Sequence, residues 1–444
     1  MADVHALGTA NVRKLLWEYS LPAIVAMLAS SLYNIVDSIF IGHGVGALAI
    51  SGLAITFPLM NLSAAFGSLI GAGGATLLSI KMGQHDVESA ERVLGNIVSL
   101  NLLLGTLFML FGLLFLEPIL LFFGASSETL PYAYDYMFVL LIGNLVTHLY
   151  LGLNSAMRST GAPRKAMLTT LMTVFINCVL DPLFIFVFDW GIRGAALATV
   201  VAQLAALIYT LVHFLNPRQE LHFKRDIFTL RRRVAVSIFS IGMAPFVLNA
   251  CSCLVVVVIN QSLLKYGSDL AVGAYGIVNR IMMLFGMLVL GFNQGMQPIA
   301  GYNYGALKMD RVKSVLKQTI LYASLVMTTG FLVVELFPEL VARMFTTDAE
   351  LLSISETGLR IVFAMAPVVG FQMVVSNFFQ SIGHASKAVF LSSTRQLLFL
   401  VPLLVILPHF FGVIGVWLSL PISDVLSSAL AAVVLFRDKM FNSK

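Results

Sequence analysis

Charge is scarce in this sequence of 444 residues. Asp, Glu, Lys and Arg together make up 11% of the chain, whereas hydrophobic residues make up 59% and the mean hydropathy is +0.92. Soluble domains carry about 25% charged residues, so the composition excludes an ordinary soluble protein. The longest polar stretch, Asn216 to Arg233, is too short for a folded catalytic module. We expect an all-α membrane protein with many spans, and no enzyme.

Metal-binding and redox patterns are equally sparse. Cys178, Cys251 and Cys253 lie in apolar runs, and their spacing matches no zinc or redox framework, so we interpret them as packing residues. No pair of histidines combines helical zinc spacing with a nearby acid, which gives metal catalysis no support. The glycine-rich segment 67–78 lacks the strand and the Lys of a phosphate-binding loop, and we expect it to pack helices.

Long apolar runs dominate the rest of the chain. They are continuous rather than alternating, which predicts membrane helices and not the strands of a β-barrel. The first run follows a polar segment without the layout of a signal peptide, so we expect a retained span. We place about twelve spans, at residues 15–41, 53–80, 93–116, 132–156, 166–188, 194–215, 235–262, 271–298, 315–337, 357–382, 388–409 and 412–436.

Basic residues gather on one side of these spans. Of the 27 Lys and Arg residues, three lie in loops on the side with few basic residues: Arg193, Lys265 and Arg343. Three more lie in or near spans: Arg280, Arg360 and Arg395. The rest, including Lys439 and Lys444, fall on the other side, which the positive-inside rule assigns to the cytoplasm. We therefore expect both termini in the cytoplasm and attribute the pI of about 9.1 to topology, not to nucleic-acid binding.

The two halves repeat the same pattern at an offset of 220 to 223 residues. Pro22 aligns with Pro245, and "MGQHDVESAERVL" (82–94) aligns with "YGALKMDRVKSVL" (304–316). Such a register indicates a duplicated six-helix unit, with both copies in the same orientation. We expect an N-lobe at 1–215, a cytoplasmic linker at 216–234 and a C-lobe at 235–444, which rock about a central cavity. No selectivity element of a channel is legible.

Two acids lie at mid-span depth in the first half. Asp37 and Asp181 each cost at least about 2.5 kcal/mol in a bilayer, so such residues face a bundle interior and carry function by default. Asn34 precedes Asp37 by three residues and Asn177 precedes Asp181 by four, which predicts an amide partner on the same helix face for each acid. The acids can share one proton or one sodium ion. Pro22 adds either a gating point or a tolerated bend.

The second half lacks these acids. By the repeat offset, Asp37 corresponds to Asn260 and Asp181 to a position near Pro402, so we assign the coupling chemistry to the first half. Other charged residues occur in the second-half spans, and either an internal ion pair or the lining of a cavity would account for them. They are Arg280, Arg395 and Asp424.

These features together resemble the multidrug and toxic compound extrusion (MATE) family, over the whole chain. The resemblance rests on "SLPAIVAMLASSLYNIVDSIFIGHGVGALAISG" (20–52), "LNSAMRSTGAPRKA" (153–166) and "INCVLDPLFIF" (176–186), and it is strongest to the DinF-like branch. The NorM-like branch carries acidic ligands in its seventh and tenth spans, and this sequence lacks acids in the middle of those spans. The resemblance implies ion coupling by Asp37, Asn154, Asn177, Asp181 and Thr199, and substrate or gating roles for Pro22, Tyr33 and Asn34.

The family implies a monomeric exporter in the bacterial or archaeal plasma membrane. It would exchange amphipathic, often cationic drugs for protons or sodium by rocker-switch alternating access, with no cofactor beyond the coupling ion. A sodium site would use Asp37, Asn177, Asp181 and Thr199. The main alternative is a flippase for lipid-linked substrates, or a metabolite exporter, of the same superfamily. A flippase should have a cationic cavity, whereas the first-half spans hold acids. An intramembrane aspartyl enzyme is a more distant third.

Overall fold

The computed structural model describes residues 5–438 and 440, so Lys439 and Lys444 lie outside the described residues. Within this range the chain is helical and contains no strand. Eleven helices are long and apolar enough to cross a membrane, or twelve if the bent pair of residues 349–381 counts as one span. That pair bends by 53° between its two helices. The predicted all-α membrane fold and its number of spans are confirmed.

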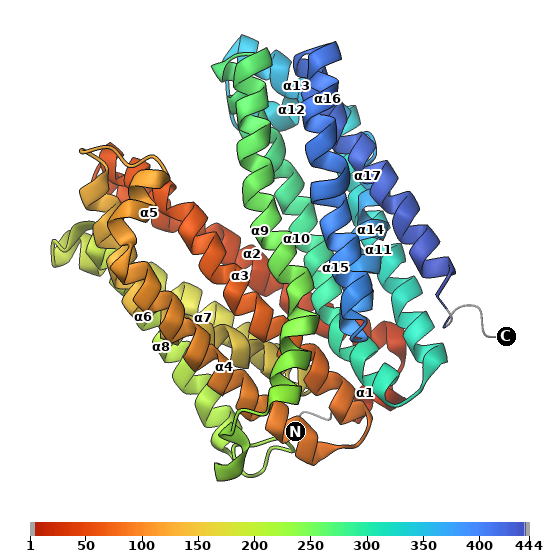
Figure 1. The fold of residues 1–444 in the computed structure, drawn as a ribbon. Helices are drawn as coiled ribbons and strands as arrows, with labels where there is room; N and C mark the ends of the chain where they lie inside the picture. Colours follow the sequence, from red (N-terminus) through yellow and green to blue (C-terminus); the bar gives the residue numbers. More distant parts are fainter. Residues whose placement is uncertain (1–4, 439, 441–444) are drawn as a thin grey trace. The chain divides into compact units, whose positions relative to one another are not determined.

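The helices of the first half follow the predicted spans, and each spanning helix begins a few residues earlier. They are α1 (Ala6–Thr9), α2 (Val12–Gly44), α3 (Ala47–Gly83), α4 (Val87–Leu114), α5 (Leu116–Phe122), α6 (Leu130–Ser159), α7 (Pro163–Pro182), the π-helix η1 (Leu183–Val187) and α8 (Gly191–Leu215). A short 3-10 helix, η2 (Arg225–Phe228), lies in the polar segment that follows. Figure 1 shows these elements from red to green along the sequence.

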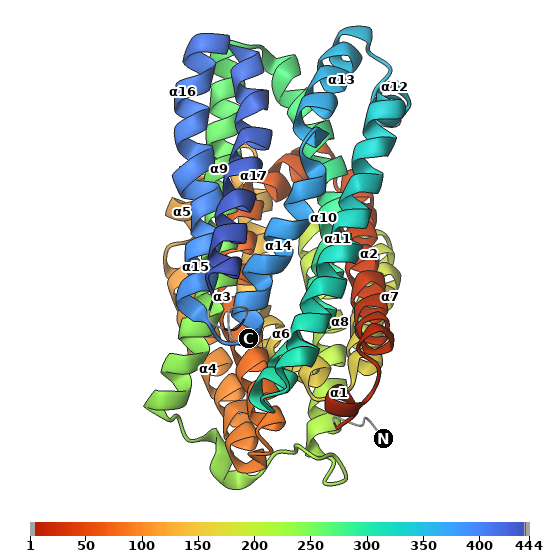
Figure 2. The ribbon, with the colours of Figure 1, turned by 90° about the vertical axis from the view of Figure 1, so that its right-hand side faces the viewer.

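The second half repeats the pattern with two of its spans interrupted. Its elements are α9 (Arg232–Tyr266), α10 (Asp269–Gly305), α11 (Met309–Leu336), α12 (Pro338–Arg343), α13 (Ala349–Phe363), α14 (Ala366–Ser381), α15 (Ala385–Ser393), the π-helix η3 (Thr394–Leu400), α16 (Val401–Phe411) and α17 (Val413–Phe436). α15, η3 and α16 form one continuous column beside α17, as the view in Figure 2 shows.

Contacts divide the chain into two compact units. One contains Val25–Phe246 together with the residues up to Ala10, and the other contains Asn11–Ile24 together with the chain from Val247 onward. The boundaries fall inside α2 and α9, two residues after Pro22 and one residue after Pro245. The division into lobes at the polar segment 216–234 stays a prediction.

Small residues allow the helices of the first unit to pack closely. A Cβ atom on Gly73 in α3 would lie 2.1 Å from the carbonyl oxygen of Ile238 in α9. A Cβ atom on Gly242 in α9 would lie only 1.8 Å from the carbonyl oxygen of Leu69 in α3. Backbones that approach this closely leave no room for a side chain. The segment 67–78 therefore packs helices, as its composition predicted.

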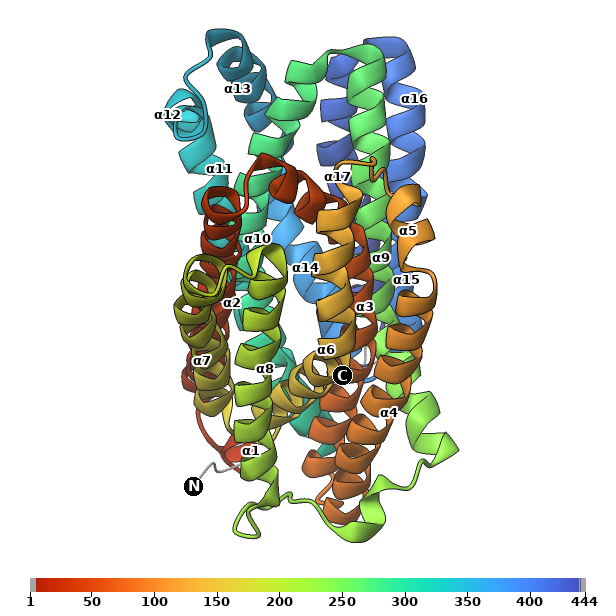
Figure 3. The same cartoon turned by 90° about the vertical axis from the view of Figure 1, so that its left-hand side faces the viewer.

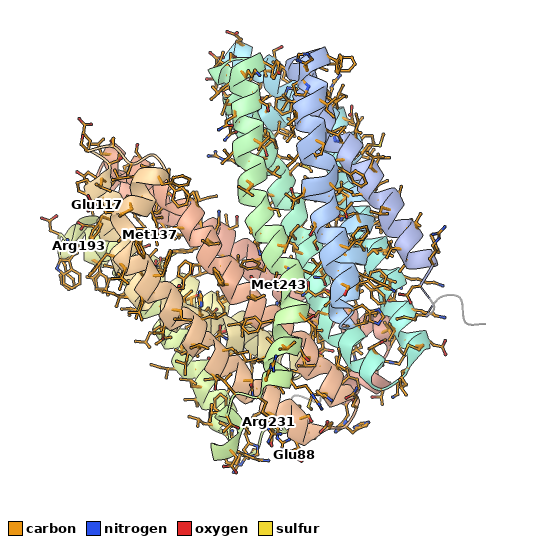
Figure 4. All side chains as sticks on the ribbon, viewed as in Figure 1. Glu88, Glu117, Met137, Arg193, Arg231 and Met243 are labelled. Atoms are coloured by element: carbon orange, nitrogen blue, oxygen red, sulfur yellow. The ribbon has the colours of Figure 1, made fainter. Side chains whose placement is uncertain are left out.

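The polar segment after α8 is anchored to the first unit. Lys224 Nζ lies 2.6 Å from a carboxylate oxygen of Glu91, which is buried in α4, and the backbone N–H of Arg231 donates to Asn96 Oδ1 at 3.1 Å. Figure 4 labels Glu88 and Arg231 at this end of the unit, and Glu117 and Arg193 at the opposite end. The segment expected as a linker is thus held along α4.

We predict that Gly242→Ala lowers the thermal unfolding temperature of the detergent-solubilised protein. The added methyl group must push Leu69 away, and overpacking of this kind costs about 1–3 kcal/mol. Gly276→Ala in α10 is the control, because no atom lies within 4 Å of a Cβ at that position. A Gly242→Ala protein that unfolds at the wild-type temperature would contradict the close packing.

Candidate functional site

Three helices of the first unit bring most of the predicted site residues together. α2 carries Tyr33 and Asp37, α7 carries Asn177 and Asp181, and α8 carries Thr199. α2 and α7 lie side by side in both Figure 2 and Figure 3, and α7 packs against α8. Asp181 is fully buried and Asp37 is 5% exposed. Two carboxyl groups are therefore enclosed in the helix bundle, and their mid-span depth stays a prediction.

Hydrogen bonds connect α2 and α8 to the amide of Asn177. The amide orientation is assigned from its neighbours: its nitrogen donates to Asp181 Oδ2 at 2.7 Å, and its oxygen accepts from the backbone N–H of Thr199 at 3.0 Å. The hydroxyl groups of Tyr33 and Thr199 lie 2.9 Å apart. The predicted pairing of Asn177 with Asp181 along one helix face is present.

The carboxyl groups of Asp37 and Asp181 are in hydrogen-bonding contact. Two touching carboxylates in a dry environment do not both stay charged unless a cation or a shared proton offsets their repulsion. One oxygen of Asp37, Oδ1, is buried and has no donor within hydrogen-bonding distance among the described residues. Carboxylate and hydroxyl oxygens are also the donors that small hard cations prefer. The site fits either one shared proton or one small cation.

A local distortion follows Asp181 directly. Pro182 has no backbone N–H, and the next five residues, Leu183–Val187, form a π-helix in which Phe188 N–H donates to the carbonyl oxygen of Leu183 at 3.0 Å. Gly194 allows α8 to approach this wider turn, because a Cβ there would lie 3.0 Å from Phe184. Proline and glycine thus set the approach of α7 and α8 next to the acid.

Asn34 does not take the position that the sequence predicted for it. Its side chain is exposed on α2 and makes no hydrogen bond among the described residues, and its carbonyl oxygen accepts from Ser38 Oγ at 2.8 Å. The predicted pairing of Asn34 with Asp37 is therefore wrong. The face of α2 that holds Asp37 turns toward α7, and Asn34 falls beyond its edge.

Asn154 and Pro22 also lie apart from the acid pair. The Asn154 amide donates to the carbonyl oxygen of Ala166 at 2.8 Å and to Thr169 Oγ1 at 2.7 Å, which ties α6 to the first turns of α7. Thr169 precedes Asn177 by two helical turns. Pro22 belongs to the part of α2 that packs with the second unit. Their proposed roles in coupling and gating stay predictions.

Tyr136 is a site residue that the sequence reasoning missed. It lies on α6, it is 2% exposed, and it is within electrostatic range of Asp37, Asp181 and Tyr33. It is one of three tyrosines in the stretch "YAYDYM" (132–137), and only one of the three faces the acids. A single sequence holds no signal that tells which one does.

We predict that Thr199→Val lowers the unfolding temperature while Thr199→Ser does not. Valine has a similar shape but no hydroxyl group, so the Tyr33 hydroxyl loses its partner, at a cost of about 1–3 kcal/mol. Serine keeps the hydroxyl group. Thermal unfolding of the three purified proteins measures the difference, and equal temperatures for the valine and serine variants would contradict the bond.

The chain is similar to known proteins over most of its length. The family model MatE matches residues 22–183 and 241–406. The multidrug export protein MepA of Staphylococcus aureus (strain NCTC 8325 / PS 47) is 27% identical over 440 residues, which cover 99% of this chain and 97% of MepA. MepA of Staphylococcus haemolyticus (strain JCSC1435) is 26% identical, over 96% of this chain and 94% of that protein.

Solved structures share the fold along its full length. DinF-BH, a MATE multidrug transporter solved in complex with rhodamine 6G, is 38% identical, with a TM-score of 0.91 and 98% of both chains covered. An outward-facing multidrug resistance transporter of the MOP superfamily superposes with a TM-score of 0.92 over 98% of this chain and 97% of its own, at 23% identity. The first match confirms the expected resemblance to the DinF-like branch.

Proposed function

This chain belongs to the MatE family, and on that premise we propose that it exports amphipathic, often cationic organic compounds in exchange for protons or sodium ions. The observation that carries the proposal is the contact between Asp37 and Asp181 in an enclosed bundle that holds polar but no basic side chains beside them among the described residues. Such a pair needs a positive partner in order to stay buried. An exchanger needs a group of this kind, because its occupancy can change the preferred arrangement of the helices.

We propose that the coupling ion binds at these two carboxyl groups. The buried Oδ1 atom of Asp37, which has no described partner, is the natural acceptor for a proton. For sodium, the two carboxylates and the Thr199 hydroxyl offer hard oxygen ligands, while the Asn177 amide orients Asp181. Either occupant halves the charge of the pair and offsets its repulsion, so α2 and α7 can come together. Without an occupant the carboxylates repel, which favours their separation and the binding of a cationic substrate.

We propose that the two units move about the prolines. The first part of α2 packs into glycines of α10, where a Cβ on Gly295 would lie 2.1 Å from Ser20 Oγ and a Cβ on Gly291 would lie 2.3 Å from Ile24. α2 changes units directly after this segment, and α9 does so directly after Pro245. Prolines weaken the backbone hydrogen bonding of a helix and allow it to bend. Rocker-switch movement therefore has two hinge points related by the internal repeat.

The orientation and the assembly state belong to the same proposal. The uneven distribution of Lys and Arg supports placing both termini in the cytoplasm of a bacterial or archaeal cell. In the first unit, Arg231 and Arg193 lie at opposite ends, which agrees with their predicted cytoplasmic and external loops (Figure 4). Each chain contains a complete acid pair, so a monomer suffices for the mechanism.

We predict that proteoliposomes export rhodamine 6G when a proton or sodium gradient is imposed, and that Asp37→Asn or Asp181→Asn reduces this flux to that of protein-free vesicles. Either change removes a charge that the ion must neutralise. Separate proton, sodium and no-gradient conditions identify the coupling ion. Asp135→Asn is the control, because Asp135 pairs with Arg193 away from the acid pair.

Two outcomes would contradict this prediction. If neither gradient drives the dye while the wild-type protein remains folded, cation-coupled drug export is excluded, and a lipid-linked or metabolite substrate becomes the next candidate. If both Asp→Asn variants export the dye as fast as the wild-type protein, the export function stands but the coupling site lies elsewhere.

We further predict that Pro22→Ala slows transport without unfolding the protein. Alanine restores a backbone N–H and stiffens α2 beside the boundary between the units. Pro58→Ala, inside α3, is the control, because that proline lies far from either boundary in the sequence. Initial rates of dye efflux in proteoliposomes measure the effect. A Pro22→Ala rate equal to wild type would remove the hinge from the mechanism.

A further inference from the structure

The segment before α9 is bonded to α4 in a way that a solvated loop does not require. Asn96 Nδ2 donates to the carbonyl oxygen of Thr229 at 3.3 Å, and Ser99 Oγ donates to that of Phe228 at 2.7 Å. Carbonyl groups in water need no partner from the protein, whereas in an apolar surrounding each must be satisfied. Asn96 and Ser99 belong to the first turns of the predicted span 93–116. The segment is therefore placed at the predicted membrane boundary.

The same segment turns apolar side chains both inward and outward. Ile227 is buried against α4, where a Cβ on Gly95 would lie only 2.1 Å from the Ile227 carbonyl oxygen. Figure 3 shows the segment beside α4. Phe228 and Leu230 face away from this contact and are 39% and 50% exposed. A segment held this tightly, with its outer side chains apolar, suits the interfacial layer of a bilayer.

Three consecutive arginines follow directly. Arg231, Arg232 and Arg233 are exposed, and none of their side chains forms an ion pair with another described residue. Arg232 and Arg233 open α9, and the first turn of a helix carries a partial positive charge. Basic side chains are unfavourable at that end unless an anion accompanies them. The group therefore has both a positive charge to offset and the free donors to do so.

Other basic residues that the sequence singled out are placed differently. Arg395 Nε donates to Asp424 Oδ1 at 2.8 Å, so an internal ion pair accounts for these two charges of the second unit. Lys224 pairs with the buried Glu91. Arg280 is exposed on α10 and stands alone in its helix. Among these positions, only the start of α9 presents a cluster of bases beside exposed apolar side chains.

Acidic groups of the same segment do not offset the cluster. Residues 216–233 contain six basic and two acidic residues, so their net charge is +4. Glu220 lies 3.6 Å from Nε2 of His5, and Asp226 is exposed without an ion pair among the described residues. Bases beside exposed aromatic and aliphatic groups match a surface that is anionic outside and apolar beneath. A nucleic acid offers no such apolar layer.

We propose that Arg231, Arg232 and Arg233, together with Phe228 and Leu230, form a docking surface for anionic phospholipids of the cytoplasmic leaflet. The guanidinium groups bind the phosphate oxygens of the headgroups, and the two apolar side chains lie among the upper acyl chains. α9 begins here and passes into the second unit after Phe246, so the lipid holds the start of that helix at the membrane surface. The inference does not depend on drug export.

The test measures which lipid touches this surface. Phe228→Trp places a fluorophore on it, and the protein is reconstituted in vesicles of equal amounts of phosphatidylcholine and phosphatidylglycerol, with one or the other brominated. Bromine quenches tryptophan on contact, and protein with Phe228 unchanged gives the background of the native tryptophans. We expect phosphatidylglycerol to bind at least about fivefold more tightly, since one arginine near an anionic surface contributes about that factor. Salt at about 1 M should remove most of this preference.

Variants in the Phe228→Trp background identify the arginines as the cause. Changing all three arginines to glutamine should lower the ratio of the two affinities to about one. Changing all three to lysine should keep most of the preference, because the positive charge is retained. Phe122→Trp is the positional control. Phe122 is 85% exposed on α5, which lies at the opposite end of the first unit with Glu117, and a tryptophan there should show no preference (Figure 4).

Equal affinities before the arginines are changed, or a preference that survives in the glutamine variant, would overturn the proposal. Inorganic phosphate added at constant ionic strength distinguishes a free anion from a lipid. If it abolishes the preference for phosphatidylglycerol, the arginines bind soluble phosphate and the lipid proposal is wrong. Thermal unfolding checks the fold of the triple glutamine variant. The single variants Arg231→Gln, Arg232→Gln and Arg233→Gln, each with a smaller expected loss, replace it if it unfolds. No export assay enters the test, so its failure leaves the proposed function untouched.

Discussion

Repulsion between two buried carboxyl groups is the constraint on which the first unit depends. Asp37 and Asp181 touch inside an apolar bundle, where the loss of hydration makes an uncompensated negative charge costly. The amide of Asn177 binds Asp181 and the backbone N–H of Thr199, and the hydroxyl group of Thr199 lies 2.9 Å from that of Tyr33, but none of these groups supplies a positive charge. In the mechanism we propose, the missing charge comes from outside the protein as the coupling ion, and this links the site to ion exchange.

The sequence predicted the features that follow from the lengths of apolar runs and from the free-energy cost of placing an acid in a bilayer. The apolar runs predicted the membrane spans, and the free-energy cost of burying an acid singled out Asp37 and Asp181 as candidate site residues. Spacing alone was less reliable: residues four apart on α7 pair as expected, whereas Asn34 and Asp37, three apart on α2, do not. A spacing of three turns the two side chains further apart, and the packing of α2 decides which of them is enclosed. Tyr33 and Thr199 came from family resemblance.

Other features depend on tertiary contacts and had no signal in the chain. Tyr136 becomes part of the site only because α6 packs beside it, and the π-helices have no single-sequence signature. The polar segment after α8 looked like a linker, yet Glu91 and Asn96 hold it on α4. The repeat explains why both halves have the same spans, but not why only the first half has acids at the positions of Asp37 and Asp181.

Proton release on substrate binding tests the central claim most directly. Wild-type protein in weakly buffered detergent solution is mixed with rhodamine 6G, and a pH indicator counts the protons released in sodium-free medium and again in saturating sodium. If the contact between Asp37 and Asp181 holds the coupling ion, the wild-type protein releases protons in sodium-free medium and fewer protons in saturating sodium. The Asp37→Asn protein releases none in either medium. Equal release from wild type and Asp37→Asn would contradict the account, because the protons would then come from another group.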